Sequence, residues 1–204
     1  MADAASEATD EMLMVRYQRG ERLAFTELVR RYETPIFNFA LRHLRHSGSA
    51  EDVTQEVFLR VVQKAASFKH EARFSTWLYT IARNLCVDQL RRQRHRRHPS
   101  LEQPATGGEG RSLADQVSDS HPRANVERAS MSTQVADRIV QAVDALPEPQ
   151  REVFLLREVG NLSFRDIADI TGVGENTVKS RMRYALERLQ EALSDFEEYA
   201  RALR

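Results

Sequence analysis

Hydrophobic residues recur at helical spacing through the C-terminal third of the chain and are interrupted once, by a short turn that contains glycine. Ser163, with Asp166 three residues later, has the pattern of a capping box and predicts the start of a helix. Gly172 and Gly174 predict a tight turn, because glycine adopts positive φ without steric cost. A second helix is expected to begin near Glu175, with its apolar stripe at Val178, Met182, Ala185, Leu186, Leu189 and Leu193. The two segments together predict a helix-turn-helix.

The opposite face of this second helix is polar and basic, with Asn176, Lys179, Ser180, Arg183 and Tyr184. A helix that is apolar on one side and cationic on the other has the layout of a reader of the DNA major groove. A charged face that is merely solvated is the alternative, since a bare helix-turn-helix pattern also occurs in proteins that bind no nucleic acid.

The N-terminal half contains a second set of helical patterns. Between residues 25 and 44 the apolar positions fall at helical spacing, at Phe25, Leu28, Val29, Tyr32, Ile36, Phe39, Ala40 and Leu44. A further helix is expected to be capped by Ser49 and to bury Val53, Val57, Phe58 and Val61. Its other face brings together four residues that can meet a basic partner or form an ordinary solvated surface: Asp52, Gln55, Glu56 and Leu59.

Aromatic and cationic residues are interleaved from residue 68 onward, at Phe68, Lys69, His70, Arg73, Phe74 and Trp77. A helix capped by Ser75 or Thr76 is expected to follow, with a core side at Leu78, Ile81, Ala82, Leu85 and Cys86. Its exposed side is expected to carry Arg83, Asn84, Asp88 and Arg91, ahead of further arginines at Arg92, Arg94, Arg96 and Arg97. This mixture suits single-stranded nucleic acid, whose bases stack on rings while cations neutralise phosphates. The aromatic residues can equally belong to the core.

Composition favours an all-α fold of two small helical domains. The chain has 41% hydrophobic and 29% charged residues with only 8 glycines and 6 prolines, and no alternating strand pattern of useful length. Residues 99–125 lack periodicity and are rich in Pro, Gly, Ser and acidic side chains, so they are expected to be a flexible acidic linker between domains 1–98 and 126–204. The net charge of zero hides an asymmetry, because residues 1–98 carry 17 Lys and Arg against 12 Asp and Glu, whereas residues 99–204 carry 13 against 18.

Several other classes of protein find no support in the residues. Cys86 is the single cysteine, which excludes an intramolecular disulfide and a cysteine-rich metal site. His43 and His46 are three residues apart but lack further ligands nearby, so we expect no metal and no cofactor. No Ser-His-Asp set or phosphate-cradling glycine loop indicates an enzyme. No apolar run approaches the roughly 20 residues of a membrane span, and the acidic N-terminus lacks the features of a signal peptide, so a cytoplasmic protein without membrane insertion is expected.

Four segments of the chain, in order, resemble the extracytoplasmic-function (ECF) group of bacterial sigma-70 factors. They are AEDVTQEVF at 50–58, FSTWLYTIARNLCVDQLRR at 74–92, LPEPQREVFLLRE at 146–158 and NTVKSRMRYA at 176–185. Each segment alone is of moderate specificity, whereas the ordered set is highly specific. The resemblance implies a non-enzymatic alternative sigma factor, with a sigma-2-like domain over 1–98 and a sigma-4-like domain over 126–204.

The resemblance also implies partners and the residues that meet them. Core RNA polymerase would bind at Asp52, Gln55, Glu56 and Leu59. The melted −10 promoter element would be held by the loop of Phe68, Lys69, His70, Arg73 and Phe74, with duplex contacts and melting assigned to Arg83, Asn84 and Arg91. Trp77 and Tyr79 would lie near the melted strand or in the supporting core. The duplex −35 element would be read by Thr177, Lys179, Ser180, Arg183 and Tyr184, with Arg181 and Arg188 on phosphates.

An anti-sigma factor is a further partner that the resemblance implies, and the holoenzyme would be associated with the nucleoid. An autonomous helix-turn-helix regulator is the alternative function. Such a regulator would need no polymerase and would typically bind a palindrome as a dimer. A plain helical interaction protein is a third hypothesis.

Overall fold

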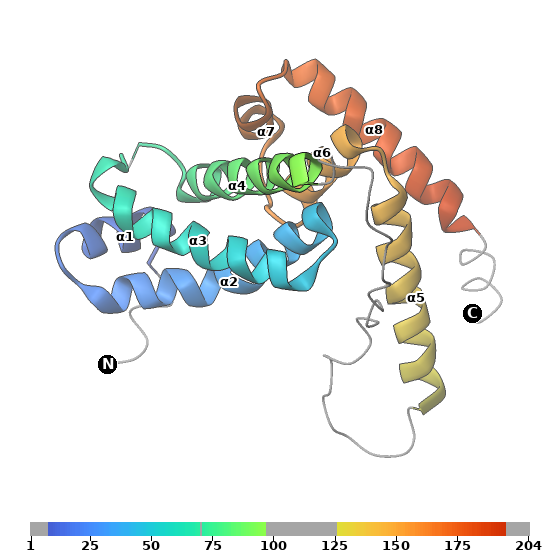
Figure 1. Cartoon of the computed structure of the whole chain (residues 1–204), viewed down its shortest axis with the longest axis horizontal. Helices are drawn as coiled ribbons and strands as arrows, with labels where there is room; N and C mark the ends of the chain where they lie inside the picture. Colours follow the sequence, from blue (N-terminus) through green and yellow to red (C-terminus); the bar gives the residue numbers. More distant parts are fainter. Residues whose placement is uncertain (1–7, 70, 97–125, 195–204) are drawn as a thin grey trace.

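The computed structural model describes residues 8–69, 71–96 and 126–194, and the regular elements in these ranges are all helices (Figure 1). The α-helices are α1 (Asp10–Gln18), α2 (Arg22–Leu44), α3 (Ser47–Lys64), α4 (Phe74–Arg96), α5 (Val126–Ala145), α6 (Glu148–Glu158), α7 (Phe164–Thr171) and α8 (Glu175–Ala192). A short 3₁₀-helix, η1 (Ala65–Ser67), follows α3. The all-α prediction is confirmed over these ranges. The predicted linker and His70 lie outside the described residues.

The helices α1, α3 and α4 pack around α2, and each of them contacts it. The apolar positions predicted between residues 25 and 44 explain this arrangement, because Leu28, Ile36 and Phe39 lie on one stripe of α2 and are fully buried. On α3 the predicted stripe at Val53, Val57 and Val61 is likewise buried, with Phe58 half-buried beside it, whose ring makes an edge contact with the Phe25 ring. These helices therefore share one hydrophobic core.

The cap of α3 differs from the prediction. The helix begins at Ser47, two residues before the expected cap, and His46 is the N-cap residue. The His46 ring nitrogen Nδ1 accepts a hydrogen bond from the Ser49 amide at 3.2 Å. The prediction of Ser49 as the cap is wrong because an imidazole nitrogen supplies the acceptor that a hydroxyl was expected to supply.

The cap of α4 also comes from an unexpected residue. The helix begins at Phe74, so Ser75 and Thr76 lie within its first turn and neither is the cap. The Phe74 amide donates instead to the carboxylate of Glu11, on α1, at 2.9 Å. A carboxylate at a helix N-terminus also complements the helix dipole. The cap is a tertiary contact, which local sequence patterns do not encode.

The predicted helix-turn-helix is present as α7, a glycine turn and α8. The Ser163 hydroxyl accepts from the Asp166 amide at 3.1 Å and the Asp166 carboxylate accepts from the Ser163 amide at 3.2 Å, which completes the capping box. Gly172 ends α7 with φ +71°, and α8 begins at Glu175 as predicted. One residue of the predicted stripe is misplaced: Leu186 is 49% exposed, since it lies about 100° around the helix from its buried neighbour Ala185.

The last three α-helices form the second packed group, with α8 contacting α5, α6 and α7. Pro147 precedes α6 as its N-cap residue and Pro149 lies in the first turn, where a missing amide donor costs little. The two groups also touch each other, because α2 contacts α6 and α4 contacts α7. In Figure 1, α6 and α7 accordingly lie beside α4, whereas α5 and α8 extend away from α1.

Candidate nucleic-acid and polymerase interface

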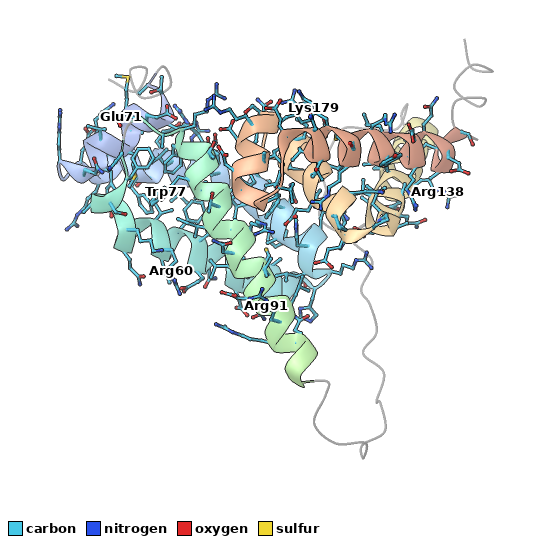
Figure 2. The ribbon with its side chains drawn as sticks, turned by 90° about the horizontal axis from the view of Figure 1, so that it is seen from above. Arg60, Glu71, Trp77, Arg91, Arg138 and Lys179 are labelled. Carbon is cyan, nitrogen blue, oxygen red and sulfur yellow. The ribbon has the colours of Figure 1, made fainter. Side chains whose placement is uncertain are left out.

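The outer face of α8 presents the predicted −35 residues to solvent. Those that are exposed are Thr177, Lys179, Ser180, Arg183, Tyr184 and Arg188, while Arg181 is half-buried. Lys179 lies at the outer edge of the molecule in Figure 2. The Arg183 guanidinium lies over the Tyr184 ring, 4.8 Å from its centroid, a cation–π contact that orients both groups. The prediction that these residues share an exposed face is confirmed in geometry.

The cations on this face are only weakly engaged within the helix. Lys179 pairs with Glu175 at 2.7 Å, and Arg183 lies 3.8 Å from the Glu187 carboxylate. Exposed pairs at this i,i+4 spacing contribute about 0.3–0.5 kcal/mol each. Such pairs are easily exchanged for contacts with phosphate or base edges, so α8 is available to a nucleic acid as it stands.

The helix α4 presents a different surface. Asn84, Asp88 and Arg91 are exposed, as predicted, and Trp77 is half-buried at the same side of the helix. Arg83 is the exception, because it is directed at α6, where its Nε donates to the Glu152 carboxylate at 2.8 Å. The expectation that Arg83 shares the exposed side with Asn84 and Arg91 is therefore wrong.

Aromatic rings from the predicted −10 loop pack on one another. Phe68 and Phe74 are 6% and 0% exposed, and their ring centroids lie 5.9 Å apart. The Trp77 ring lies 5.2 Å from Phe68 and 6.0 Å from Phe74, and Tyr32 closes the cluster with a ring centroid 5.4 Å from that of Phe74. These contacts give the loop a rigid apolar base, while Lys69 and Arg73 remain exposed at its surface.

Tyr79 belongs to the core, the second of the two positions that the sequence left open for it. It is buried, its ring makes an edge contact with Phe39 at 5.3 Å, and its hydroxyl donates to the Val159 carbonyl at 3.2 Å. Burial raises the pKa of the Tyr79 hydroxyl well above its ordinary value. The hydroxyl is therefore a neutral hydrogen-bond donor that joins α4 to the segment after α6.

The predicted polymerase-binding face of α3 is exposed and mixed in character. Asp52 and Gln55 are exposed, and Glu56 pairs with Arg60 at 2.6 Å. Leu59 is 54% exposed, and Val62, three residues later on the same face, is 43% exposed. An apolar patch beside carboxylates is the composition of a docking surface. Val62 was not predicted from the sequence, although its spacing from Leu59 was a usable signal.

A polar seam joins the two groups of helices. Besides the Arg83–Glu152 pair, Arg42 lies 3.7 Å from the Asp144 carboxylate. A hollow of about 500 Å³ follows this seam and is lined by residues of both groups: His43, Leu44, Arg45, His46, Ser49, Leu90, Gln93, Glu148 and Arg151. Burial lowers the pKa of His43 to about 4, and the Arg151 charge acts in the same direction, so this histidine is neutral near pH 7.

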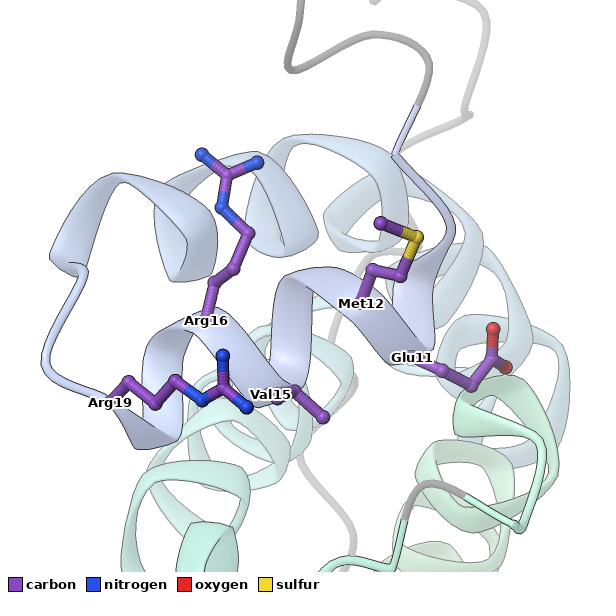
Figure 3. A pocket seen from close by; sticks show the side chains of 5 residues that line it. All are labelled: Glu11, Met12, Val15, Arg16 and Arg19. Carbon is purple, nitrogen blue, oxygen red and sulfur yellow. The ribbon is translucent and has the colours of Figure 1, made fainter.

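The two histidines on and beside α2 do not form a metal site. His43 and His46 do not act as a pair, because the former ring bonds the Phe39 carbonyl at 3.1 Å and the latter caps α3. Among the described residues no group of three or more His, Cys, Asp or Glu is placed to hold a metal ion. Within the same ranges, no helix combines the length and the apolar character that a bilayer span requires. A second hollow, of about 360 Å³, is lined by residues of α1 and by Arg19, which directly follows it (Figure 3), and contains none of the predicted site residues.

Comparison with known proteins decides the family. Residues 28–96 match the family model of sigma-70 region 2, and residues 136–189 match that of sigma-70 region 4. The ECF RNA polymerase sigma factor SigW of Bacillus subtilis is 32% identical over 179 residues, covering 87% of this chain and 93% of that protein. The chain belongs to the ECF sigma factors. The ECF RNA polymerase sigma-E factor of Escherichia coli K12 is also 32% identical, over 90% of this chain and 93% of its own length.

Solved structures of sigma factors share the fold. RpoE of Bartonella quintana, in complex with the anti-sigma factor NepR, superposes with a TM-score of 0.60 at 24% identity, over 83% of this chain and 96% of that one. CnrH in complex with the cytosolic domain of CnrY superposes with a TM-score of 0.63 at 19% identity, over 92% of this chain and 99% of that one. The protein is thus an alternative sigma factor that acts in transcription initiation, and sigma factors are non-enzymatic initiation factors.

Proposed function

We propose that this sigma factor binds core RNA polymerase through the exposed face of α3 and reads promoter DNA through two separate helices. The −35 element is read as duplex by α8, and the −10 element is held as a partly melted strand by α4 and the loop before it. The open basic face of α8 is the observation that carries this proposal, since Lys179, Ser180 and Arg183 are exposed together on a helix whose other side is buried.

For the −10 element, the predicted residues fall into exposed ones that can contact DNA and buried ones that cannot. The exposed Lys69, Arg73, Asn84 and Arg91 contact the DNA strand and its phosphates, and Trp77 offers a ring for stacking. Phe68 and Phe74 support the loop from beneath, because they are buried. Unstacking a base costs a few kcal/mol, so a loop held rigidly in place avoids a further ordering cost. His70 is proposed for the same loop from the sequence alone.

Polymerase binding is proposed for Asp52, Gln55, Glu56 and Leu59, extended by Val62. The exposed apolar pair supplies buried area when a partner covers it, and the acidic residues give orientation toward a basic surface. An anti-sigma factor that covers polymerase-facing surfaces is a further proposed partner, in line with the complex of the RpoE relative with the anti-sigma factor NepR. The protein itself is proposed to be a cytoplasmic, non-enzymatic factor with domains over 1–98 and 126–204 and a linker over 99–125.

In vitro transcription tests the proposal. Purified core polymerase is incubated with a pool of genomic promoter fragments, with and without this protein, and the transcripts are sequenced. Discrete new transcripts that need both components support the sigma role and define the −35 and −10 sequences. If the protein instead shifts DNA alone and leaves core polymerase inert, the autonomous regulator is the better hypothesis.

Two variants of α3 then test the proposed polymerase-binding surface. The double change Asp52→Ala with Gln55→Ala should weaken binding to core polymerase without loss of helicity, whereas Glu51→Ala, an exposed neighbour on the same helix, is the matched control. Core binding is measured by fluorescence anisotropy of labelled protein. Unchanged core affinity in the double variant would remove α3 from the proposed polymerase interface.

A further inference from the structure

Besides the Arg42–Asp144 pair, hydrogen bonds donated by three side chains connect the two groups of helices. The Arg83 guanidinium, on α4, bonds the Glu152 carboxylate, on α6, at 2.8 Å. The Tyr79 hydroxyl donates to the Val159 carbonyl at 3.2 Å. At the far end, the Arg45 guanidinium donates to the backbone carbonyl at the Asp144 position, near the end of α5. These hydrogen bonds span residues 69 to 99 positions apart in the sequence, so they hold the chain in a closed form.

The Arg83–Glu152 pair is partly enclosed at this seam. Its two side chains are 24% and 13% exposed, whereas the pairs on α8 are about half exposed or more. An ion pair that is partly removed from water is screened less by salt and interacts more strongly than an exposed one. The contact is therefore a stronger restraint than the exposed ion pairs on α8.

One continuous face of α4 is covered at this seam. Tyr79, Arg83, Cys86 and Leu90 recur at i, i+4, i+7 and i+11, which is a single helix face. Tyr79 and Cys86 are fully buried, and Leu90 lines the seam hollow together with Arg151 of α6. The second group of helices thus packs against the face of α4 that lies next to Asn84 and Arg91.

We propose that Glu152 competes with nucleic acid for Arg83. Its carboxylate bonds the Arg83 guanidinium and holds α6 against α4, a contact called the latch below. The latch keeps the free sigma factor closed until polymerase or promoter DNA releases it. The partner that this face of α4 fits is the chain's own helix α6, which presents the Glu152 carboxylate to Arg83. A guanidinium bonds carboxylate and phosphate with the same planar fork, so the two anions compete for one group. The competition with DNA rests on the function proposed above; the latch itself does not.

The latch predicts how the free protein behaves. While Arg83 is paired with Glu152, a DNA strand bound to α4 makes no contact with this guanidinium. If about 90% of the free molecules are closed, the apparent affinity for DNA is about tenfold weaker than the affinity of the open form. Removing the Glu152 charge should restore most of the tenfold loss in apparent DNA affinity, although residue 152 itself makes no contact with DNA.

The single cysteine provides a probe of closure in the full-length protein. Cys86 follows Arg83 by one turn on the covered face, and burial together with the Glu152 carboxylate raises the pKa of its thiol to about 12. The thiol should react slowly with a disulfide reagent such as DTNB when the seam is closed. Glu152→Gln is expected to accelerate this reaction about tenfold, whereas Glu158→Gln, an exposed glutamate on the same helix, should leave the rate as in the wild type.

DNA affinity is then measured for the same proteins without polymerase, using a single-stranded oligonucleotide of random sequence at one fixed salt concentration. Glu152→Gln should bind about five to ten times more tightly than the wild type and than Glu158→Gln. Equal thiol rates in all three proteins would overturn the latch. A faster thiol reaction with unchanged DNA affinity would overturn the competition with nucleic acid and leave only the closed form.

A charge exchange keeps the test decisive if Glu152→Gln disturbs folding. The double variant Arg83→Glu with Glu152→Arg restores an ion pair of reversed polarity and should return thiol protection to within about twofold of the wild type. Either single change should leave the thiol exposed; a double variant as reactive as the singles contradicts the pairing. Transcription by the wild type with core polymerase is run in parallel, so that a failure of the sigma role is distinguished from a failure of the latch.

Discussion

The two helices proposed to contact promoter DNA differ in how ready they are to do so. On α8 the outer face is open, and its cations make only exposed contacts within the same helix. On α4 one face rests on the protein core, a second face meets α6 through Arg83, and only the side with Asn84 and Arg91 is open. Under the proposed function, duplex DNA meets an exposed surface on α8, whereas the Arg83 face of α4 is reached only when the seam opens.

The difference also appears in what supports each helix. The position of α8 depends on a turn and a capping box that are local in sequence, at Gly172 and Ser163. The start of α4 depends on distant residues, because Glu11 caps it and the Tyr32 ring packs against Phe74. Under the proposed function, the helix that holds the melted strand is the one supported by distant residues, and a single strand has no fixed shape of its own.

The largest effect is expected from removing the aromatic base of α4. Phe74→Ala deletes a fully buried ring that contacts Phe68, Trp77 and Tyr32, and should lower the free energy of unfolding by about 3–5 kcal/mol. Tyr184→Ala on α8 is the matched control; its ring is exposed, so the change should stay within about 0.5 kcal/mol. Urea denaturation followed by circular dichroism measures both. A small loss in Phe74→Ala would mean that the loop before α4 has no rigid base.

Acid should lower the stability of the fold through His43, which lines the seam hollow. His43 is buried and neutral, with a pKa lowered from its usual 6.5 to about 4 by burial and by the charges of Arg151 and Arg83, against the opposing effects of the Phe39 carbonyl and Glu148. Because the unfolded chain takes up this proton first, stability is complete above pH 6.5 and is lost as the pH falls toward 4. The expected loss is about 3 kcal/mol over this range, of which about 2 kcal/mol falls above pH 5.

The His43→Asn variant isolates this contribution. An amide can replace the Nδ1 donor to the Phe39 carbonyl but does not titrate, so the variant should lose less stability than the wild type between pH 7 and pH 5. Urea denaturation at both pH values gives the difference. The same slope in the two proteins would show that His43 takes up its proton as readily in the folded protein as in the unfolded chain.

The binding free energy for −35 DNA should change less than the free energies of unfolding above. Arg183→Ala removes an exposed guanidinium and should weaken binding to a −35 duplex, once its sequence is known from transcription, by about 1–3 kcal/mol. Arg138→Ala, an exposed arginine on α5, is the control. Core polymerase affinity should be unchanged in both variants. If Arg183→Ala reduces core binding instead, the division of roles between α3 and α8 is incorrect.

Sequence patterns predicted the elements better than their tertiary contacts. The helix-turn-helix was predictable because its capping box, its glycine turn and its apolar stripe are all encoded within thirty residues around Gly172. The caps of α3 and α4 were not, because an imidazole and the distant Glu11 carboxylate supply the acceptors.

Arg83 illustrates the limit for the candidate site. Its spacing from Asn84 and Arg91 suggested a shared exposed side, yet Glu152 lies 69 positions later in the sequence and draws it to the seam. Nothing local indicates such a partner. Leu186 marks a smaller error, in which an apolar residue next to a buried stripe was assigned to it.

The smallest expected effect concerns the start of the helix-turn-helix. Ser163→Ala removes the hydroxyl that accepts from the Asp166 amide, and should lower the free energy of unfolding by about 1 kcal/mol. Ser180→Ala, an exposed serine on α8, is the control and should change stability by less than about 0.5 kcal/mol. Urea denaturation at pH 7 measures both, and equal stabilities would mean that the capping box does not support α7.

The same variant also tests whether α7 and α4 are coupled. Burial raises the pKa of Asp166, but hydrogen bonds from the side chains of Ser163 and Thr76 and from the Ser163 amide, together with the positive charge of Arg73, outweigh it, so the pKa is lowered overall. The carboxylate therefore stabilises the fold at neutral pH, and this contribution is lost as the pH falls through its lowered pKa. Without the Ser163 hydroxyl the pKa should rise toward its usual value, and the acid-dependent loss of stability should become shallower. An unchanged slope would assign the lowered pKa to the groups that remain in the variant, which are Thr76, the amide of residue 163 and Arg73.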